Sequence, residues 1–233
     1  MSEVCEVLRS SAFFGIALSV LCFEAASWIK AKLKWPIFNP FLIATLLVIG
    51  VLKLLNISYA EYNNSAQHLN VLMTPATVCL AVPLYRKLDM LRRNLAAVLG
   101  SIVCGVLINM AVVFGLSLLL GMGHEEYVSM LPKSITTPIG LALCEEYGGI
   151  RSITVLVILF TGIIGNVAGE IMFSLLRVRW PMSRGLAMGA SAHAIGTAKA
   201  MEMGEAEGAM SGLAIAVTGV LTVIIAPLFT HLI

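Results

Sequence analysis

The feature of this sequence that most restricts its fold is the length of its apolar blocks. Runs such as 102–120 and 153–176 reach the roughly 18 residues or more that an α-helix needs to cross the hydrocarbon core of a bilayer. Helices buried inside a soluble protein are the alternative, but they would need a polar protein around them. Only 12% of the 233 residues are charged, against roughly a quarter in soluble domains. The sequence therefore predicts an all-α polytopic membrane protein.

The distribution of basic residues orients the chain. Apolar segments are expected at about 10–30, 37–56, 67–85, 94–121, 131–147, 152–176, 184–200 and 209–232. Lys and Arg gather between the first two segments, before the fourth, and between the sixth and seventh, and such loops stay on the cytoplasmic side. The connections 58–66 and 121–130 contain neither residue type. We therefore expect about seven spans, with the amino terminus outside and the carboxyl terminus in the cytoplasm.

One apolar segment does not fit a simple alternation of spans. Only one full crossing can lie between the outer loop 121–130 and the basic loop 177–184, so segment 131–147 is predicted to be a re-entrant hairpin. Residues 37–121 and 152–232 then form two inverted repeats inside a single domain that covers 1–233, an architecture typical of secondary transporters. Chance similarity between two apolar triplets of helices is the alternative.

The predicted hairpin is the first of three apolar segments that retain polar groups. Pro132 and Pro138 interrupt it, and broken backbone at membrane depth is tolerated where it lines a cavity or is buried in protein. Its polar residues, Lys133, Ser134, Thr136 and Thr137, are candidates for binding an anionic substrate near a helix amino terminus. An extracellular loop with a helix cap is the alternative.

The second polar segment is rich in small residues. Its candidate substrate-binding residues are Ser191, His193, Gly196, Thr197 and Lys199, with unwinding considered at Gly196. His193 and Thr197 share one helix face, and Lys199 lies three residues from Glu202, which allows an ion pair. His193 and Glu202 are candidates for proton coupling. A histidine that simply bonds one helix to another is the alternative.

The third polar segment is the predicted symmetry mate of the second. Thr74, Pro75, Thr77 and Pro83 are expected to shape the cavity, together with Pro138 and with Asn39 and Asn166 in the long helices. Glu170 is a carboxylate far inside an apolar run. It could carry a proton, pair with Lys133 or Lys199, or face a lumen, and the sequence leaves these roles open.

Other classes of function receive no support from the sequence. The chain shows no HExxH, GxSxG or Walker motif, so we expect no enzyme, cofactor or ATP-driven pump. The five cysteines lack CxxC spacing, and no cluster of metal ligands is expected. A net charge of +2 without a basic, aromatic-interleaved cluster gives no reason to expect nucleic-acid binding.

Several of these motifs resemble the LrgB/CidB family of bacterial inner-membrane proteins. The resemblance spans essentially the whole chain and is carried by Asn39-Pro40-Phe41-Leu42, the run from Pro75 to Tyr85, Leu131 to Pro138, Arg184 to Gly189, and most specifically Ser191-x-His193-Ala-Ile-Gly-Thr-Ala-Lys199. Glu170 departs from that pattern, because the family tends not to place an acid after the glycine.

This resemblance implies two functions and one partner. Family members are described as antiholin-like regulators of murein hydrolases and lysis, and are also tied to transport of small carboxylates such as pyruvate and glycolate or glycerate. They usually work with a small LrgA/CidA-type membrane protein. Together with the residue pattern, this favours a secondary transporter of small monocarboxylates, with regulation of lysis through a holin-like partner as the alternative. The long apolar helices are also expected to support a homo-oligomer, such as a dimer.

Overall fold

The computed structural model describes residues 11–33, 40–72, 75, 79, 85–86 and 88–233. All regular secondary structure in these ranges is helical. The chain divides by its internal contacts into two compact units, Met1–Val78 and Cys79–Ile233. Four predicted cavity-shaping residues, Asn39, Thr74, Thr77 and Pro83, lie outside the described residues.

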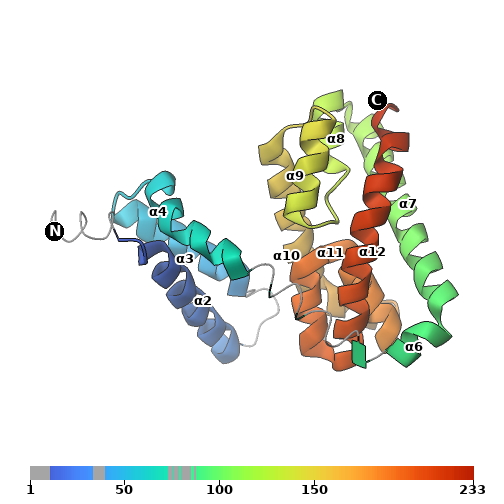
Figure 1. Cartoon of the computed structure of the whole chain (residues 1–233), viewed down its shortest axis with the longest axis horizontal. Coiled ribbons are helices and arrows are strands. Elements are labelled where there is room, and N and C mark those ends of the chain that lie inside the picture. Colours follow the sequence, from blue (N-terminus) through green and yellow to red (C-terminus); the bar gives the residue numbers. More distant parts are fainter. Residues whose placement is uncertain (1–10, 34–39, 73–74, 76–78, 80–84, 87) are drawn as a thin grey trace. The chain divides into compact units, whose positions relative to one another are not determined.

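The first unit is built on two apolar helices, α2 (Phe14–Leu33) and α3 (Pro40–Leu54), followed by α4 (Tyr59–Ala66) and the 3-10 helix η1 (Gln67–Leu72) (Figure 1). Cys22, Ala26 and Ala44 form its small core, where α2 meets α3. The Gly15 amide donates to Ser65 Oγ at 2.7 Å and ties α4 to α2. This unit therefore combines apolar packing with a buried polar contact.

Helix α4 lies in a stretch that the sequence analysis treated only as a connection. Ser58 is its N-cap residue, and the Glu61 amide donates to the Ser58 hydroxyl at 3.3 Å. The Glu61 carboxylate accepts the Ser58 amide at 2.7 Å, which completes a capping box. The Ser-x-x-Glu spacing is a signal for a helix start that the length of apolar runs does not contain.

The second unit contains the longest helices (Figure 1). Its elements are α6 (Leu88–Arg93), α7 (Leu95–Leu120), α8 (His124–Met130), α9 (Thr137–Glu146), α10 (Arg151–Leu175), α11 (Pro181–Met203) and α12 (Glu205–Thr230). One face of α7 buries Val98, Ile102, Val106, Met110 and Val113 in the core of this unit. Their spacing of three or four residues is that of a single helix face. Helices α11 and α12 contact α7 and supply much of the rest of this core.

The predicted membrane-protein class agrees with the helices observed. Among the described residues, α2, α7, α10 and α12 are long and apolar enough to cross a membrane. Helix α11 has comparable length, whereas α3 is a shorter apolar helix. The number of seven spans stays a prediction, and so does the inverted repeat, because the segments it compares belong to both units.

The two ends of the segment predicted to be re-entrant lie next to each other in the second unit. The Ile150 amide donates to Ser129 Oγ at 2.6 Å, and the Thr154 hydroxyl donates to the Ser129 carbonyl at 2.9 Å. Between these ends lie a turn over 131–136 and the ten-residue α9. A helix of that length rises only about 15 Å, half of a bilayer core. The segment is therefore a closed hairpin; its position in a membrane stays a prediction.

Glycines allow α11 to lie unusually close to both of its neighbours. A Cβ added at Gly189 on α11 would collide with the Ser211 carbonyl of α12, and one at Gly185 with the Glu207 carbonyl. On the α10 side, a Cβ at Gly162 would lie 2.8 Å from His193 Cε1. Small residues of this kind let helix backbones approach closely in membrane proteins. The positions of α10, α11 and α12 relative to one another thus depend on these glycines.

We expect Gly189→Ala to destabilise the protein, because the new methyl group must displace the backbone of α12. Overpacking of this kind costs about 1–3 kcal/mol. Gly100→Ala on α7 is the matched control, since nothing lies within 4 Å of a Cβ at that position. Alanine there should raise helix stability by up to about 1 kcal/mol. Thermal unfolding in detergent compares the two variants, and equal midpoints would contradict the close approach.

Candidate functional site

A hollow of ≈ 400 Å³ lies in the second unit between α7, the 131–136 turn and the first half of α11. Asn109 lines it from α7, and Lys133 and Ser134 line it from the turn. Ser183 and Ser191 line it from α11. Three residues predicted to bind substrate, Lys133, Ser134 and Ser191, therefore meet in one cavity.

The polar side chains of this hollow form a short hydrogen-bond chain. Lys133 Nζ donates to Ser134 Oγ at 3.2 Å, and Ser134 Oγ donates to Asn109 Oδ1 at 3.4 Å. Ser134 is buried and Lys133 half-buried. Within the described residues, Lys133 has no carboxylate within 4.0 Å. A partly desolvated ammonium without an acidic partner favours an anionic ligand.

The local sequence explains how Lys133 reaches this cavity. The Lys133 amide donates to the Met130 carbonyl at 3.2 Å, and the Ile135 amide donates to the Pro132 carbonyl at 3.3 Å. These bonds make a tight turn after α8. The next helix, α9, then begins with Thr136 as N-cap and Pro138 in its first turn, a position where proline is well tolerated.

Two residues that the sequence analysis grouped with Lys133 lie beside the hollow without lining it. Thr136 and Thr137 are half-buried at the start of α9, and the exposed Pro138 follows them. Neither threonine is among the residues that enclose the cavity. Their role in substrate binding stays a prediction. Lys133 and Ser134 line the cavity, whereas these two threonines do not.

Helix α11 is broken at His193. This residue has φ 42° and ψ −135°, a conformation outside the right-handed helix, and it separates two helical halves. The buried imidazole places Nε2 2.9 Å from the Ile158 carbonyl of α10. Because a carbonyl only accepts, Nε2 carries the hydrogen in this bond. The break falls three residues before Gly196, the position considered for unwinding in the sequence analysis.

Gly196 and Thr197 hold the second half of α11 in place. A Cβ at Gly196 would lie 2.6 Å from the Met188 carbonyl, so the two halves of α11 meet closely at the break. The buried Thr197 hydroxyl lies 2.6 Å from the hydroxyl of Ser211 on α12. Gly196, His193 and Thr197 thus lie in contacts between helix segments. None of them lines the hollow that holds Lys133.

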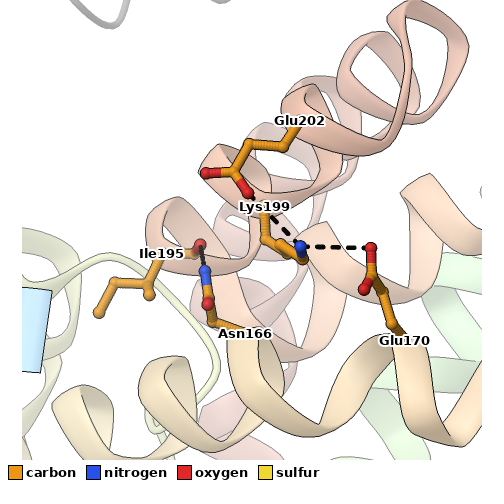
Figure 2. A network of polar contacts seen from close by, with 5 residues as sticks. All are labelled: Asn166, Glu170, Ile195, Lys199 and Glu202. Carbon is orange, nitrogen blue, oxygen red and sulfur yellow. Dashed lines mark hydrogen bonds and ion pairs between the residues drawn. The ribbon is translucent and has the colours of Figure 1, made fainter. Parts of the chain in front are cut away.

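Lys199 belongs to a separate polar network between α10 and α11 (Figure 2). Its Nζ lies 3.2 Å from Glu170 Oε1 and 3.4 Å from Glu202 Oε2. Asn166, one turn before Glu170 on α10, donates to the Ile195 carbonyl at 3.0 Å. Of the roles left open for Glu170, the structure shows pairing with Lys199. Glu202, a candidate for proton coupling, shares the same lysine.

The two lysines predicted to offset a substrate charge therefore have different surroundings. Lys133 faces a cavity without a nearby carboxylate among the described residues, whereas Lys199 is paired with two. Pro75, predicted to shape the cavity, is exposed in the other unit. Asn109 and Ser183 were missed by the sequence analysis. A lone asparagine within the apolar 26-residue α7 was the signal that could have identified the first of them.

Comparison with known proteins gives matches over nearly the whole chain. Residues 19–232 match the LrgB-like family. The chain is 36% identical over 224 residues to the antiholin-like protein LrgB of Bacillus subtilis (strain 168), covering 96% of this chain and 97% of that protein. It is 35% identical over 218 residues to the antiholin-like proteins LrgB of Bacillus cereus (strain B4264) and Bacillus anthracis (strain CDC 684 / NRRL 3495). These matches cover 93% of this chain and 95% of each relative. No solved structure matches the chain.

The break in α11 leads to a testable prediction about substitutions at His193. At a regular helix position glycine is about 1 kcal/mol less stable than alanine, but a positive φ of this kind favours glycine. We expect His193→Gly to be more stable than His193→Ala by about 1 kcal/mol. At position 194 we expect the opposite: Ala194→Gly should be less stable than the wild type, because Ala194 lies in regular helix. Thermal unfolding in detergent measures both comparisons, and His193→Ala as the more stable variant would argue against the break.

Proposed function

The chain belongs to the LrgB-like family, and on this premise we propose that it is an antiholin-like protein of the bacterial cytoplasmic membrane. The single observation that carries this proposal is its similarity, along nearly its whole length, to proteins named antiholin-like. Their names support this function more than the carboxylate transport favoured by the sequence pattern. In this proposal, the protein restrains a holin-like membrane partner and so delays the action of murein hydrolases.

The helices offer a physical route for such an interaction. Helices α7, α10 and α12 are apolar and present large exposed side chains, such as Leu119, Phe160 and Leu228. Within a bilayer, helices associate by close packing and interhelical hydrogen bonds rather than by exclusion of water. A small LrgA/CidA-type protein is the partner that this proposal names, and a homodimer could use the same surfaces. The proposed orientation places the amino terminus outside and the carboxyl terminus in the cytoplasm.

Lysis kinetics test the antiholin-like role. In a bacterium that lacks its own gene of this family, we expect earlier lysis and higher murein hydrolase activity than in the parent strain. Expression of this chain should restore the delay, and so should Lys133→Ala, because this substitution leaves the exposed apolar side chains of α7, α10 and α12 unchanged. Culture turbidity and hydrolase zymograms follow both effects. Unchanged lysis with and without the chain would contradict the proposal.

The hollow around Lys133 favours a second candidate function, the transport of small monocarboxylates. Its volume of ≈ 400 Å³ is ample for a pyruvate-sized anion. Lys133 would offset the carboxylate charge, and the Asn109 side-chain NH2 group would donate to its oxygens. The Ser134 and Ser191 hydroxyls, which donate to Asn109 Oδ1 and to the Ala187 carbonyl, would rotate to donate to the ligand instead. Segments of α11 on either side of the His193 break could move separately, which is the kind of hinge that alternating access requires.

Uptake of labelled pyruvate and glycolate into proteoliposomes tests the second candidate. Loss of a charge-assisted hydrogen bond costs about 1.5–3 kcal/mol, so Lys133→Ala should reduce uptake at subsaturating substrate by about tenfold or more. Lys133→Arg, which keeps the charge, should retain part of the activity. Lys53→Ala is the matched control, because Lys53 is exposed and lies in the other unit. Absence of saturable uptake, with the LrgA-type partner and a pH gradient present, would leave lysis control as the function.

A further inference from the structure

A second hollow, of ≈ 450 Å³, lies where α10 ends and α11 begins. Three arginines line it: Arg177, Arg179 and Arg184. Phe173 and Met203 supply its apolar wall. Neither proposed function uses this cavity, and its residues are distinct from those around Lys133.

The backbone at the end of α10 shapes this hollow and anchors one of its arginines. Helix α10 ends at Leu175, Arg177 then has a left-handed conformation (φ 55°), and the Val178 amide donates back to the Phe173 carbonyl at 2.8 Å. Arg184 Nε then donates to the Val178 carbonyl at 2.8 Å, and its guanidinium lies 6.0 Å from the centre of the Phe173 ring. These contacts use only part of the Arg184 guanidinium. The connection between α10 and α11 is therefore an ordered turn, in which the Arg184 side chain is held near the Phe173 ring.

The charge of this hollow is mostly uncompensated. Among the described residues, Glu170 is the one carboxylate that lines it, and this carboxylate lies 3.2 Å from Lys199 Nζ. In the described part of the chain, none of the three arginines has a carboxylate within 4.0 Å. Arg177 and Arg179 are exposed. Guanidinium groups present paired donors that match the oxygens of a phosphate.

The surroundings of the hollow indicate where such a phosphate comes from. Leu175, Leu176 and Trp180 flank the arginines with 73%, 65% and 78% of their surface exposed. Exposed leucines are suited to acyl chains, and tryptophan is enriched at the level of lipid headgroups. The positive-inside rule places this loop at the cytoplasmic leaflet, where anionic lipids attract basic segments. We propose that the hollow formed by Arg177, Arg179 and Arg184 binds the phosphate of an anionic phospholipid.

Native mass spectrometry and lipid titration of the purified full chain test this site. The probes are phosphatidylglycerol, phosphatidylcholine and inorganic phosphate, each added to protein in neutral detergent. The test variant is Arg177→Gln/Arg179→Gln, which spares the structural contacts of Arg184. The matched control is Arg92→Gln/Arg93→Gln, which removes two exposed charges from α6. Arg179→Gln alone serves as a milder variant should the double variant fold poorly.

We expect the wild type and the α6 control to bind phosphatidylglycerol in preference to phosphatidylcholine. Each arginine removed from the hollow should weaken that binding by about fivefold. Equal binding of phosphatidylglycerol by all variants would overturn the proposal. Inorganic phosphate that binds more tightly than phosphatidylglycerol, with the same dependence on arginine, would assign the site to a soluble phosphate instead and overturn the lipid assignment.

Discussion

The close approach of α11 to α10 on one side and α12 on the other is the contact on which the rest of the second unit depends. It exists because glycines stand where side chains would otherwise meet backbone, as at Gly185 and Gly189 against α12. In a bilayer, lipid is as apolar as the helix surfaces, so such packing stabilises helix association where exclusion of water cannot. The polar bonds between these helices, from His193 to Ile158 and from Thr197 to Ser211, require that short distance.

This packing also explains how a polar helix can lie among apolar ones. Helix α11 carries Ser, His, Thr and Lys side chains, and each such group is costly inside a membrane unless it has a partner. Ser191 donates to its own helix at the Ala187 carbonyl, His193 bonds to α10 and Thr197 to α12. Gly162 leaves the space that the His193 ring occupies. The small residues of this region therefore allow the close helix contacts in which its polar side chains find their hydrogen-bond partners.

The sequence predicted long apolar helices such as α7 and α10 well, because hydrophobic length is a local property that tertiary contacts rarely override. The segment 152–176, for example, corresponds to α10 within one residue at each end. Most of the predicted segment 67–85 lies outside the described residues. Short polar helices such as α4 and α8 were not predicted, since helices of eight and seven residues carry no long apolar run. The position of the break could not be predicted from the sequence. Gly196 is the more permissive residue, but the structure has the distortion at His193, whose ring bonds to Ile158 of α10. The sequence grouped Lys133 with Lys199, yet which of them faces a cavity depends on a fold that residue spacing alone does not determine.

The difference between these two lysines bears directly on function. Lys199 has its charge balanced by Glu170 and Glu202, so a ligand there would have to compete with existing ion pairs. Lys133 lies in a hollow where its bond is to the neutral Ser134 hydroxyl, and the cost of partial burial is not offset by any described carboxylate. A protein that only packed against another helix would be more stable with an apolar residue at that position. The presence of an ammonium group there is therefore a physical reason to pursue anion binding alongside the antiholin-like role.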